Sequence, residues 1–225
     1  MTVIPPRGGE VIGDAADRRV EILADHPSLH ATWSRFAPGR DGADLHVHHE
    51  HTDLFYVLEG EFALRLGPQG EEHTLPAGTL ACVPPDVVHG FRNAGDAELR
   101  FLNFHAPGVG FAAYMRDLRD GRPAAYDQWD PPEDGGRPIS EVEVGERVDV
   151  PAIKIFPATT EPGPPESHTD ARHTEIYVLE GGLAVVGARA EAGAWVHVPP
   201  GEPHTLEALG DAPARCLVVH TPAEQ

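Results

Sequence analysis

Residues 45–60 read LHVHHEHTDLFYVLEG, and this stretch decides the fold of the chain. Four histidines and two acidic residues precede an apolar run that ends at a glycine. The apolar run is typical of a short strand that closes in a tight turn. Because residues two apart in a strand share one face, we expect His46 and His48 to point the same way. The stretch therefore places several metal-competent side chains just before a hairpin.

The chain repeats this stretch and the segments that follow it. YVLEG occurs at 56–60 and at 177–181, and VPP occurs at 83–85 and at 198–200. Late in each copy, RFLNFHAP (100–107) pairs with RCLVVHTP (215–222). The spacing exceeds the period of small structural repeats, which is about 20 to 50 residues, so it indicates a duplicated domain.

Glycine and proline interrupt the sequence at short intervals, and the runs between them are rich in β-forming residues. This pattern predicts an all-β sandwich or barrel of short antiparallel strands. Helical spacing of apolar residues is convincing only at 110–121, where Phe111, Tyr114, Met115 and Leu118 share one face. We therefore predict one short helix after the first copy.

The first copy contains two motifs whose residue types and intervals are typical of one protein family. The first motif consists of His46, His48, Asp53 and Gly60. The second consists of Gly78, Pro84, Asp86, His89 and Asn93. In residue types and spacing, both resemble the two motifs of the cupin superfamily, and the whole chain resembles the quercetin dioxygenase-like bicupins. Two letters depart from the family pattern, because Asp53 replaces a glutamate and Asp86 replaces a glycine that often has positive φ.

The resemblance implies two tandem cupin barrels, each a double-stranded β-helix or jelly roll, joined by a short connecting helix. We predict an N-terminal barrel with the connecting helix at 1–121, a linker at 122–139, and a C-terminal barrel at 140–225. The linker range is rich in proline, glycine and aspartate. The C-terminal barrel has a degraded first motif.

The resemblance also implies that His46, His48, Asp53 and His89 hold one divalent transition metal in the N-terminal barrel. Three imidazoles and a carboxylate suit Fe, Mn, Ni, Cu, Co or Zn and leave coordination positions open. Asp53 is also the expected catalytic proton acceptor.

Three neighbours of this set have alternative roles. Glu50 is in phase with His46 and His48 if the strand runs straight, so it is a rival to Asp53 as the carboxylate ligand. His49 and His51 are out of phase, and we interpret them as groups at the rim that orient the ligands by hydrogen bonds.

The second copy can be aligned with the first in two ways. Alignment on YVLEG puts Ser167, Thr169 and Thr174 at the first-motif positions, where none is a good ligand. A shift by one residue instead gives a weaker second site, consisting of His168, Asp170, Glu175 and His204. The YVLEG alignment is the longer match, so we expect the C-terminal barrel to be metal-free or to bind metal weakly.

Composition narrows the classes of partner. The chain has 225 residues, a net charge of −19 and no basic stripe, which argues against nucleic acid. It has no apolar run of about 20 residues and no signal peptide at MTVIPPRGGE, so no membrane span is expected and the default location is the cytoplasm. We expect a small-molecule substrate and a monomer or homodimer.

Three functions remain open, because one fold hosts many activities. The leading hypothesis is a metal-dependent oxidoreductase, a dioxygenase acting on a small phenolic or enolic compound. The second is a metal-dependent isomerase or lyase acting on a small oxygenated acid or sugar. Arg65 and Arg92 are candidates to line its pocket, although we interpret them as exposed partners of acidic neighbours. The third is a non-catalytic small-molecule-binding cupin. The pocket wall is expected to include Phe55 or Tyr56 and some of Phe62, Phe91, Phe101 and Phe104.

Overall fold

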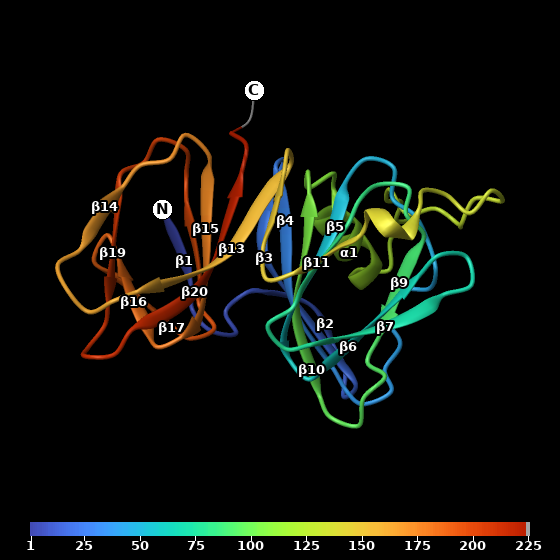
Figure 1. The fold of residues 1–225 in the computed structure, drawn as a ribbon, viewed down its shortest axis with the longest axis horizontal. Coiled ribbons are helices and arrows are strands. Elements are labelled where there is room, and N and C mark those ends of the chain that lie inside the picture. The colour runs from blue at the N-terminus through green and yellow to red at the C-terminus, as the bar shows by residue number, and fades with distance from the viewer. Residues whose placement is uncertain (224–225) are drawn as a thin grey trace. The chain divides into compact units, whose positions relative to one another are not determined.

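The computed structural model describes residues 1–223, which form two compact units built mainly of antiparallel strands (Figure 1). The first unit is Glu10–Glu146, and we call it the first barrel. The second unit combines Met1–Gly9 with the chain from Arg147 onward, and we call it the second barrel. The predicted all-β fold with two domains is confirmed. Among the described residues, no helix is both long enough and apolar enough to span a bilayer.

The first barrel contains a seven-stranded sheet in the order β11-β8-β5-β10-β4-β3-β2 and a three-stranded sheet in the order β7-β6-β9. Its strands are β2 (Glu10–Asp14), β3 (Arg18–His26), β4 (Leu29–Phe36), β5 (Thr52–Glu59), β6 (Glu61–Leu66), β7 (Glu71–Pro76), β8 (Leu80–Val83), β9 (His89–Arg92), β10 (Leu99–Ala106) and β11 (Glu143–Gly145). A short 3₁₀ helix, η1, covers Ile139–Glu141.

Alternating apolar residues of these strands fill the first barrel. Phe55 of β5, Phe62 of β6 and Phe101 of β10 are almost fully buried and lie in one aromatic cluster. Burying such rings supplies much of the free energy of a small β-core. Between β5 and β6, Gly60 has a φ of 81°, and a Cβ there would come within 2.6 Å of the Glu98 carbonyl oxygen, so the turn requires glycine.

The predicted helix is α1 (Phe111–Arg119), which begins after Gly110. Met115 and Ala112 are buried against Ile12 of β2, whereas Leu118 on the predicted apolar face is 51% exposed. The helix therefore covers one side of the first barrel with part of its apolar face.

The second barrel contains a six-stranded sheet in the order β1-β18-β15-β20-β13-β12 and a four-stranded sheet in the order β14-β19-β16-β17. Its strands are β1 (Thr2–Ile4), β12 (Val148–Val150), β13 (Ile153–Thr160), β14 (Glu166–His168), β15 (His173–Glu180), β16 (Gly182–Val185), β17 (Ala188–Glu191), β18 (Trp195–Val198), β19 (His204–Ala208) and β20 (Ala214–Thr221).

The bounds of the units differ from the predicted domain bounds at both ends of the first barrel. The N-terminal strand β1 pairs with β18, so residues 1–9 belong to the second barrel. Strand β11 pairs with β8, so the predicted linker and the residues up to Glu146 belong to the first barrel. Each exchanged strand has only three residues, and its backbone pairing leaves no periodic signal in the sequence.

Candidate metal centre

The segment that carries His46 and His48 crosses the mouth of the first barrel ahead of β5. His46 exchanges two backbone hydrogen bonds with His89, each 2.9 Å long, and Val47 exchanges two with Trp129, each 3.0 Å long. These pairings are isolated bridges outside the named strands, so His46 and His48 do not lie in the regular strand that their spacing suggested. The two histidine side chains nevertheless meet, with ring centroids 4.6 Å apart.

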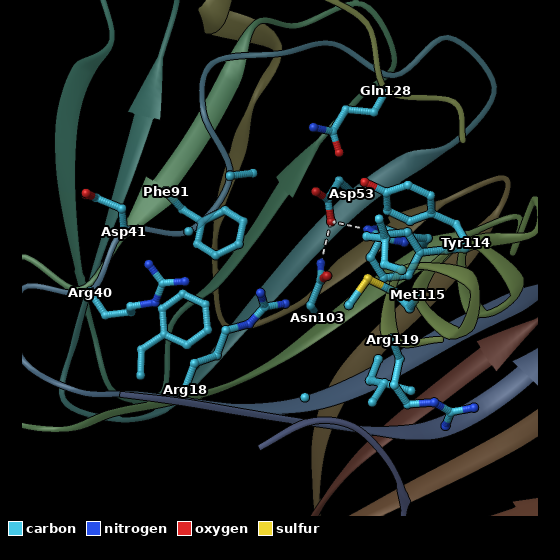
Figure 2. Close-up of a pocket in the computed structure, with 18 of the residues that line it drawn as sticks. Arg18, Arg40, Asp41, Asp53, Phe91, Asn103, Tyr114, Met115, Arg119 and Gln128 are labelled. Atoms are coloured by element: carbon cyan, nitrogen blue, oxygen red, sulfur yellow. Dashed lines mark hydrogen bonds and ion pairs between the residues drawn. The ribbon is translucent and has the colours of Figure 1, made fainter. Parts of the chain in front are cut away.

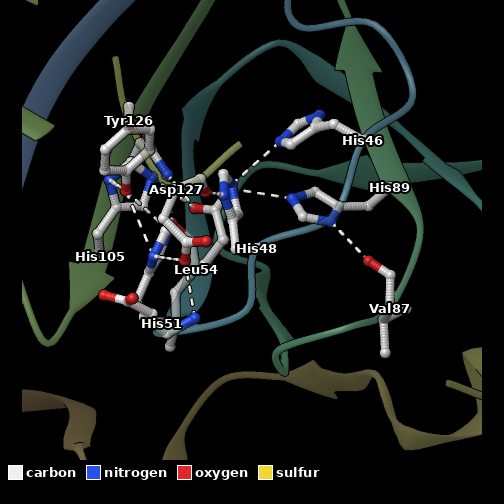
Figure 3. A network of polar contacts seen from close by, with 12 residues as sticks. His46, His48, His51, Leu54, Val87, His89, His105, Tyr126 and Asp127 are labelled. Atoms are coloured by element: carbon white, nitrogen blue, oxygen red, sulfur yellow. Dashed lines mark hydrogen bonds and ion pairs between the residues drawn. The ribbon is translucent and has the colours of Figure 1, made fainter. Parts of the chain in front are cut away.

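The structure brings together the four residues of the predicted ligand set, and Figure 3 shows the three histidines among them. One ligand atom from each of His46, His48, Asp53 and His89 lies within 4.8 Å of all the others, and all four residues are buried. The His46 and His48 Nε2 atoms are 3.0 Å apart, and Asp53 Oδ2 lies 3.2 Å from His89 Nε2 and 3.7 Å from His48 Nε2. Two nitrogens bound about 2.1 Å from one octahedral ion lie roughly 3.0 Å apart, so the spacing fits a shared metal.

Backbone carbonyl groups fix the orientation of the three imidazoles. His46 Nδ1 donates to the Asp44 carbonyl at 2.7 Å, His89 Nδ1 donates to the Val87 carbonyl at 2.9 Å, and His48 Nδ1 donates to the Asp127 carbonyl. Each Nε2 lone pair therefore points into the cluster. Burial, and then the neighbouring His89 and His48, lower the pKa of His46 to about 3, so this imidazole is neutral at physiological pH.

Two residues of β10 support Asp53 from the side opposite His89. Asn103 Nδ2 donates to Asp53 Oδ1 at 2.5 Å, and His105 Nε2 lies 3.2 Å from the same oxygen. Burial alone would raise the pKa of Asp53, but the adjacent His105 contributes to holding it well below its usual value. Sequence reasoning missed both residues, although the repeated RFLNFHAP segment places them in phase on one strand face.

His51 does not lie at the rim, since it is 1% exposed and contacts Tyr126 and His105. Tyr126 Oη lies 2.8 Å from His51 Nε2 and 3.2 Å from His105 Nδ1. His51 Nδ1 in turn lies 3.2 Å from an oxygen of Asp127. Burial and the neighbouring His105 lower the pKa of His51 to about 2. A segment predicted as linker thus reaches back to brace the cluster.

Glu50 and His49 lie outside the cluster. Both are exposed, and both backbone amides donate to the Asp127 carboxylate, at 2.7 Å for Glu50 and at 2.9 Å for His49. The His49 side chain contacts Asp86 at 2.5 Å, and Asp86 has a φ of 66°, as expected for the glycine position that it fills. The geometry therefore favours Asp53 over Glu50 as the carboxylate ligand.

In the second barrel, the YVLEG alignment describes β15, and the alignment shifted by one residue describes β14. Thr174 pairs with Val198 just as Asp53 pairs with Val83, which is the YVLEG alignment. His168 pairs with His204 just as His46 pairs with His89, which is the shifted alignment. The intervening segment is one residue shorter in the second barrel, so both registers are correct.

The four residues of the possible second site do not form one cluster. The rings of His168 and His204 are 5.7 Å apart, and His168 is exposed. Glu175 lies next to Thr174 on β15 and therefore faces the opposite side of that strand. Asp170 is held by Arg172, with the closer contact at 2.8 Å. Among the described residues, none of the clusters of possible metal ligands contains any of these four residues.

A cavity of about 500 Å³ opens onto the cluster in the first barrel (Figure 2). His46, His48 and Asp53 line it together with Phe36, Phe91, Phe111, Tyr114, Met115, Arg18 and Arg40. Of the aromatic residues expected to line a pocket, only Phe91 is among those that do, because Phe55, Phe62 and Phe101 belong to the core.

Arg65 and Arg92, the candidates for a pocket wall, have other partners, and Arg92 has the acidic neighbour that we expected. Arg92 Nε donates to Glu72 Oε1 at 2.6 Å, and Arg65 Nη2 donates to the Ala43 carbonyl oxygen at 2.9 Å. Neither lines the cavity, where Arg18 and Arg40 stand instead.

Comparison with known proteins agrees with this architecture. The cupin domain model matches residues 32–105 and again residues 155–220. This chain belongs to the cupin family. Among curated proteins, no sequence match is found for this cupin.

Solved structures resemble this cupin over almost its whole length. YhhW from Escherichia coli covers 100% of this chain and 98% of its own, with 14% identity and a TM-score of 0.69. The complex of the bacterial pirin YhhW with nickel(II), also from Escherichia coli, has 13% identity, covers 99% of each chain and has a TM-score of 0.67. A mutant of Bacillus subtilis oxalate decarboxylase has 14% identity, a TM-score of 0.65, and coverage of 100% of this chain and 78% of its own. At such identities the similarity shows the fold alone.

Proposed function

We propose that this cupin is a metal-dependent oxidoreductase of the dioxygenase type that acts on a small phenolic or enolic compound. The observation that carries the proposal is the cavity of about 500 Å³, which joins the His and Asp cluster to an aromatic wall. Its size falls within the range of about 300 to 1,000 Å³ that is usual for small-molecule sites. The nickel(II) complex of pirin YhhW supports a transition metal in a similar fold.

The residues present fit a metal, because three imidazole Nε2 atoms and one carboxylate oxygen converge while each Nδ1 donates to a backbone carbonyl group. His46, His48, His89 and Asp53 would hold it. When bound, the metal would polarise a substrate hydroxyl and provide the redox chemistry toward oxygen.

The protein side chains would orient the substrate and receive its proton. Asp53 is anionic and held by Asn103 through Oδ1, so it can accept the proton of a hydroxyl that approaches the cluster. Phe36 and Phe91 line the cavity with rings 6.0 Å apart and would exclude water from an aromatic substrate.

A second function is favoured by one observation, the presence of Arg18 and Arg40 in the same cavity. Arginines suit the carboxylate of a small oxygenated acid, and a metal acting only as a Lewis acid could then support isomerase or lyase chemistry.

Oxygen uptake separates these functions. The purified protein is loaded in turn with Fe, Mn, Ni, Cu, Co and Zn and mixed with a panel of phenols and enolic acids. We expect oxygen consumption that matches substrate loss with at least one metal and is abolished in Asp53→Asn. Product formed without oxygen would identify an isomerase or lyase. Tight binding with no turnover would identify a non-catalytic binding protein.

A further inference from the structure

The cavity in the first barrel has a charged end that the metal cluster does not use. Arg18 of β3 and Arg40 line it together with Asp53 of the cluster. In Figure 2 the Arg18 guanidinium extends toward Asn103 and Asp53, and Arg40 lies beside it. One small molecule can therefore contact both the cluster and Arg18.

Arg18 has no carboxylate partner among the described residues. Within the described part of the chain, no Asp or Glu oxygen lies within 4.0 Å of its guanidinium, and its Nε is buried without a hydrogen-bond acceptor. Its neighbour on the same strand, Arg19, contrasts with it, because it binds Asp14 at 2.8 Å and Glu21 at 2.7 Å. In a chain with 36 acidic and 17 basic residues, an unpaired cation in a cavity is conspicuous. A buried donor without a partner costs about 1 to 3 kcal/mol, which an anionic ligand would recover.

Arg40 adds to this positive charge. Its nearest partner is Asp17, with Oδ2 3.2 Å from Nε, but Asp17 is 57% exposed, so solvent weakens the pair. Burial, and then the charge of Arg40, lower the pKa of Arg18, although a guanidinium remains protonated at any physiological pH. Arg18 and Arg40 therefore repel each other until an anion lies between or beside them.

The surroundings of Arg18 indicate the shape of the ligand. The Arg18 guanidinium carbon lies 5.9 Å from the centre of the Phe36 ring, and Phe91 stacks on Phe36. A planar ring fits against such a wall, and the guanidinium fork presents two parallel N–H groups that match the two oxygens of a carboxylate.

We propose that Arg18, assisted by Arg40, binds a carboxylate of the substrate, which is then a small aromatic or enolic acid whose hydroxyl reaches the His and Asp cluster. This inference rests on the proposed function for the role of the cluster. The anion site itself is independent of the metal.

Calorimetry on the chelated and the metal-loaded protein tests the site with matched pairs of probes. The acids are benzoate, phenylacetate and the 2-, 3- and 4-hydroxybenzoates, and each is compared with its neutral amide. Phenyl phosphate tests whether a phosphate replaces the carboxylate. We expect at least one acid to bind at least 10-fold more tightly than its amide, with or without metal.

Variants of Arg18 test whether this residue causes the preference for an acid over its amide. Charge-assisted hydrogen bonds contribute about 1.5 to 3 kcal/mol, so Arg18→Gln should weaken acid binding roughly 10- to 100-fold and leave amide binding unchanged. Arg18→Lys, which keeps the charge and loses the fork, should give an intermediate loss. Arg19→Gln is the matched control on the same strand, outside the cavity, and should bind the acids as the unmodified protein does.

Several outcomes overturn the inference. These are no acid preferred over its amide, a preference that survives in folded Arg18→Gln and Arg18→Lys, and a stronger preference for phenyl phosphate than for every carboxylate. Thermal unfolding of each variant shows whether it is folded. Acid binding that depends on Arg18 without any oxygen uptake would leave the anion site standing and remove the dioxygenase function. Oxygen uptake on neutral phenols, with no acid preferred over its amide, would keep the dioxygenase function and remove the anion site.

Discussion

The two barrels share one strand plan but differ at the positions that face the mouth. Where the first barrel has Asp53 and Asn103, the second has Thr174 and Val218 at the matching places in the ladders. His105 has a counterpart in His220, and His89 has one in His204. The second barrel therefore has three matching imidazoles, of His168, His204 and His220, and lacks the carboxylate at the position of Asp53. A duplicated fold can keep its pairing register while only one copy retains a complete set of ligands.

The cores of the two barrels also differ, since the first is aromatic where the second is mostly aliphatic. Phe55, Phe62 and Phe101 pack together in the first barrel, whereas Ile176, Leu183 and Cys216 occupy the matching places in the second. Strand pairing thus tolerates both aromatic and aliphatic packing. The proposed chemistry rests on a few polar residues of the first barrel, namely His46, His48, Asp53 and His89.

The largest effect that separates the barrels should come from removing one imidazole from each. His89→Ala should weaken metal binding by more than about 100-fold, because ligand loss exceeds the effect of losing an outer hydrogen bond. The matched variant His204→Ala should leave the affinity unchanged. Competition with a fluorescent chelator measures both. Equal losses in the two variants would mean that the barrels share the metal.

A smaller effect is expected from exchanging one supporting residue for its counterpart. Asn103→Val gives the first barrel the residue that the second barrel has at Val218. Without the hydrogen bond to Asp53 Oδ1, metal affinity should fall roughly 10- to 100-fold. Thr174→Val, which removes the polar group at the carboxylate position of the second barrel, is the control and should change nothing. An unchanged affinity in Asn103→Val would show that Asp53 needs no support.

Acid should weaken the metal-free first barrel through His46. Its pKa is about 3 in the folded chain and 6.5 in the reference state, so the unfolded chain binds more protons between these values. Stability is therefore present above pH 6.5 and is lost as the pH falls toward 3, by up to about 1.4 kcal/mol per pH unit for this proton.

Hydrogen exchange of the chelated protein, corrected for intrinsic rates, resolves the two barrels. Between pH 4 and 7 we expect protection of β5 peptides to fall with acid, and to fall less steeply in His46→Gln. The variant should not change the pH dependence of β15 peptides. The same slope in β5 of both proteins would contradict the assignment to His46.

The smallest effect belongs to the ion pair of the second barrel. Asp170 and Arg172 have side chains 26% and 42% exposed, so Asp170→Asn should cost less than about 1 kcal/mol in urea unfolding at pH 7. The hydrogen bond from Arg172 lowers the pKa of Asp170 to about 2, so this contribution is present above the reference value of 3.8 and is lost as the pH falls to 2. Loss of metal in this variant would show that Asp170 is a ligand.

The resemblance to the two cupin motifs was enough to predict which four residues come together. His46, His48 and Asp53 of the first motif meet His89 of the second in the folded chain. The residues of the site that lie outside the motifs are brought to it by contacts between distant parts of the chain. Residues 122–129 read as a linker, yet Tyr126 and Asp127 reach His51 and His49.

The anion end of the cavity shows the same limit. Arg18 lies on a strand outside both motifs, and only the fold brings it to the cavity that Asp53 lines. Arg65 and Arg92 were nearer to the motifs in sequence and found partners elsewhere. Among the described residues, Arg18 lines the cavity without the carboxylate partner that Arg19 and Arg92 have, and a sequence alone does not show such an absence.

The central claim is that the first barrel alone holds the metal, and anomalous scattering from crystals grown with nickel or manganese tests it most directly. The account predicts one strong peak per chain, about 2.0 to 2.3 Å from the Nε2 atoms of His46, His48 and His89 and close to Asp53. A peak between His168 and His204, at full occupancy or in place of the first, would contradict it.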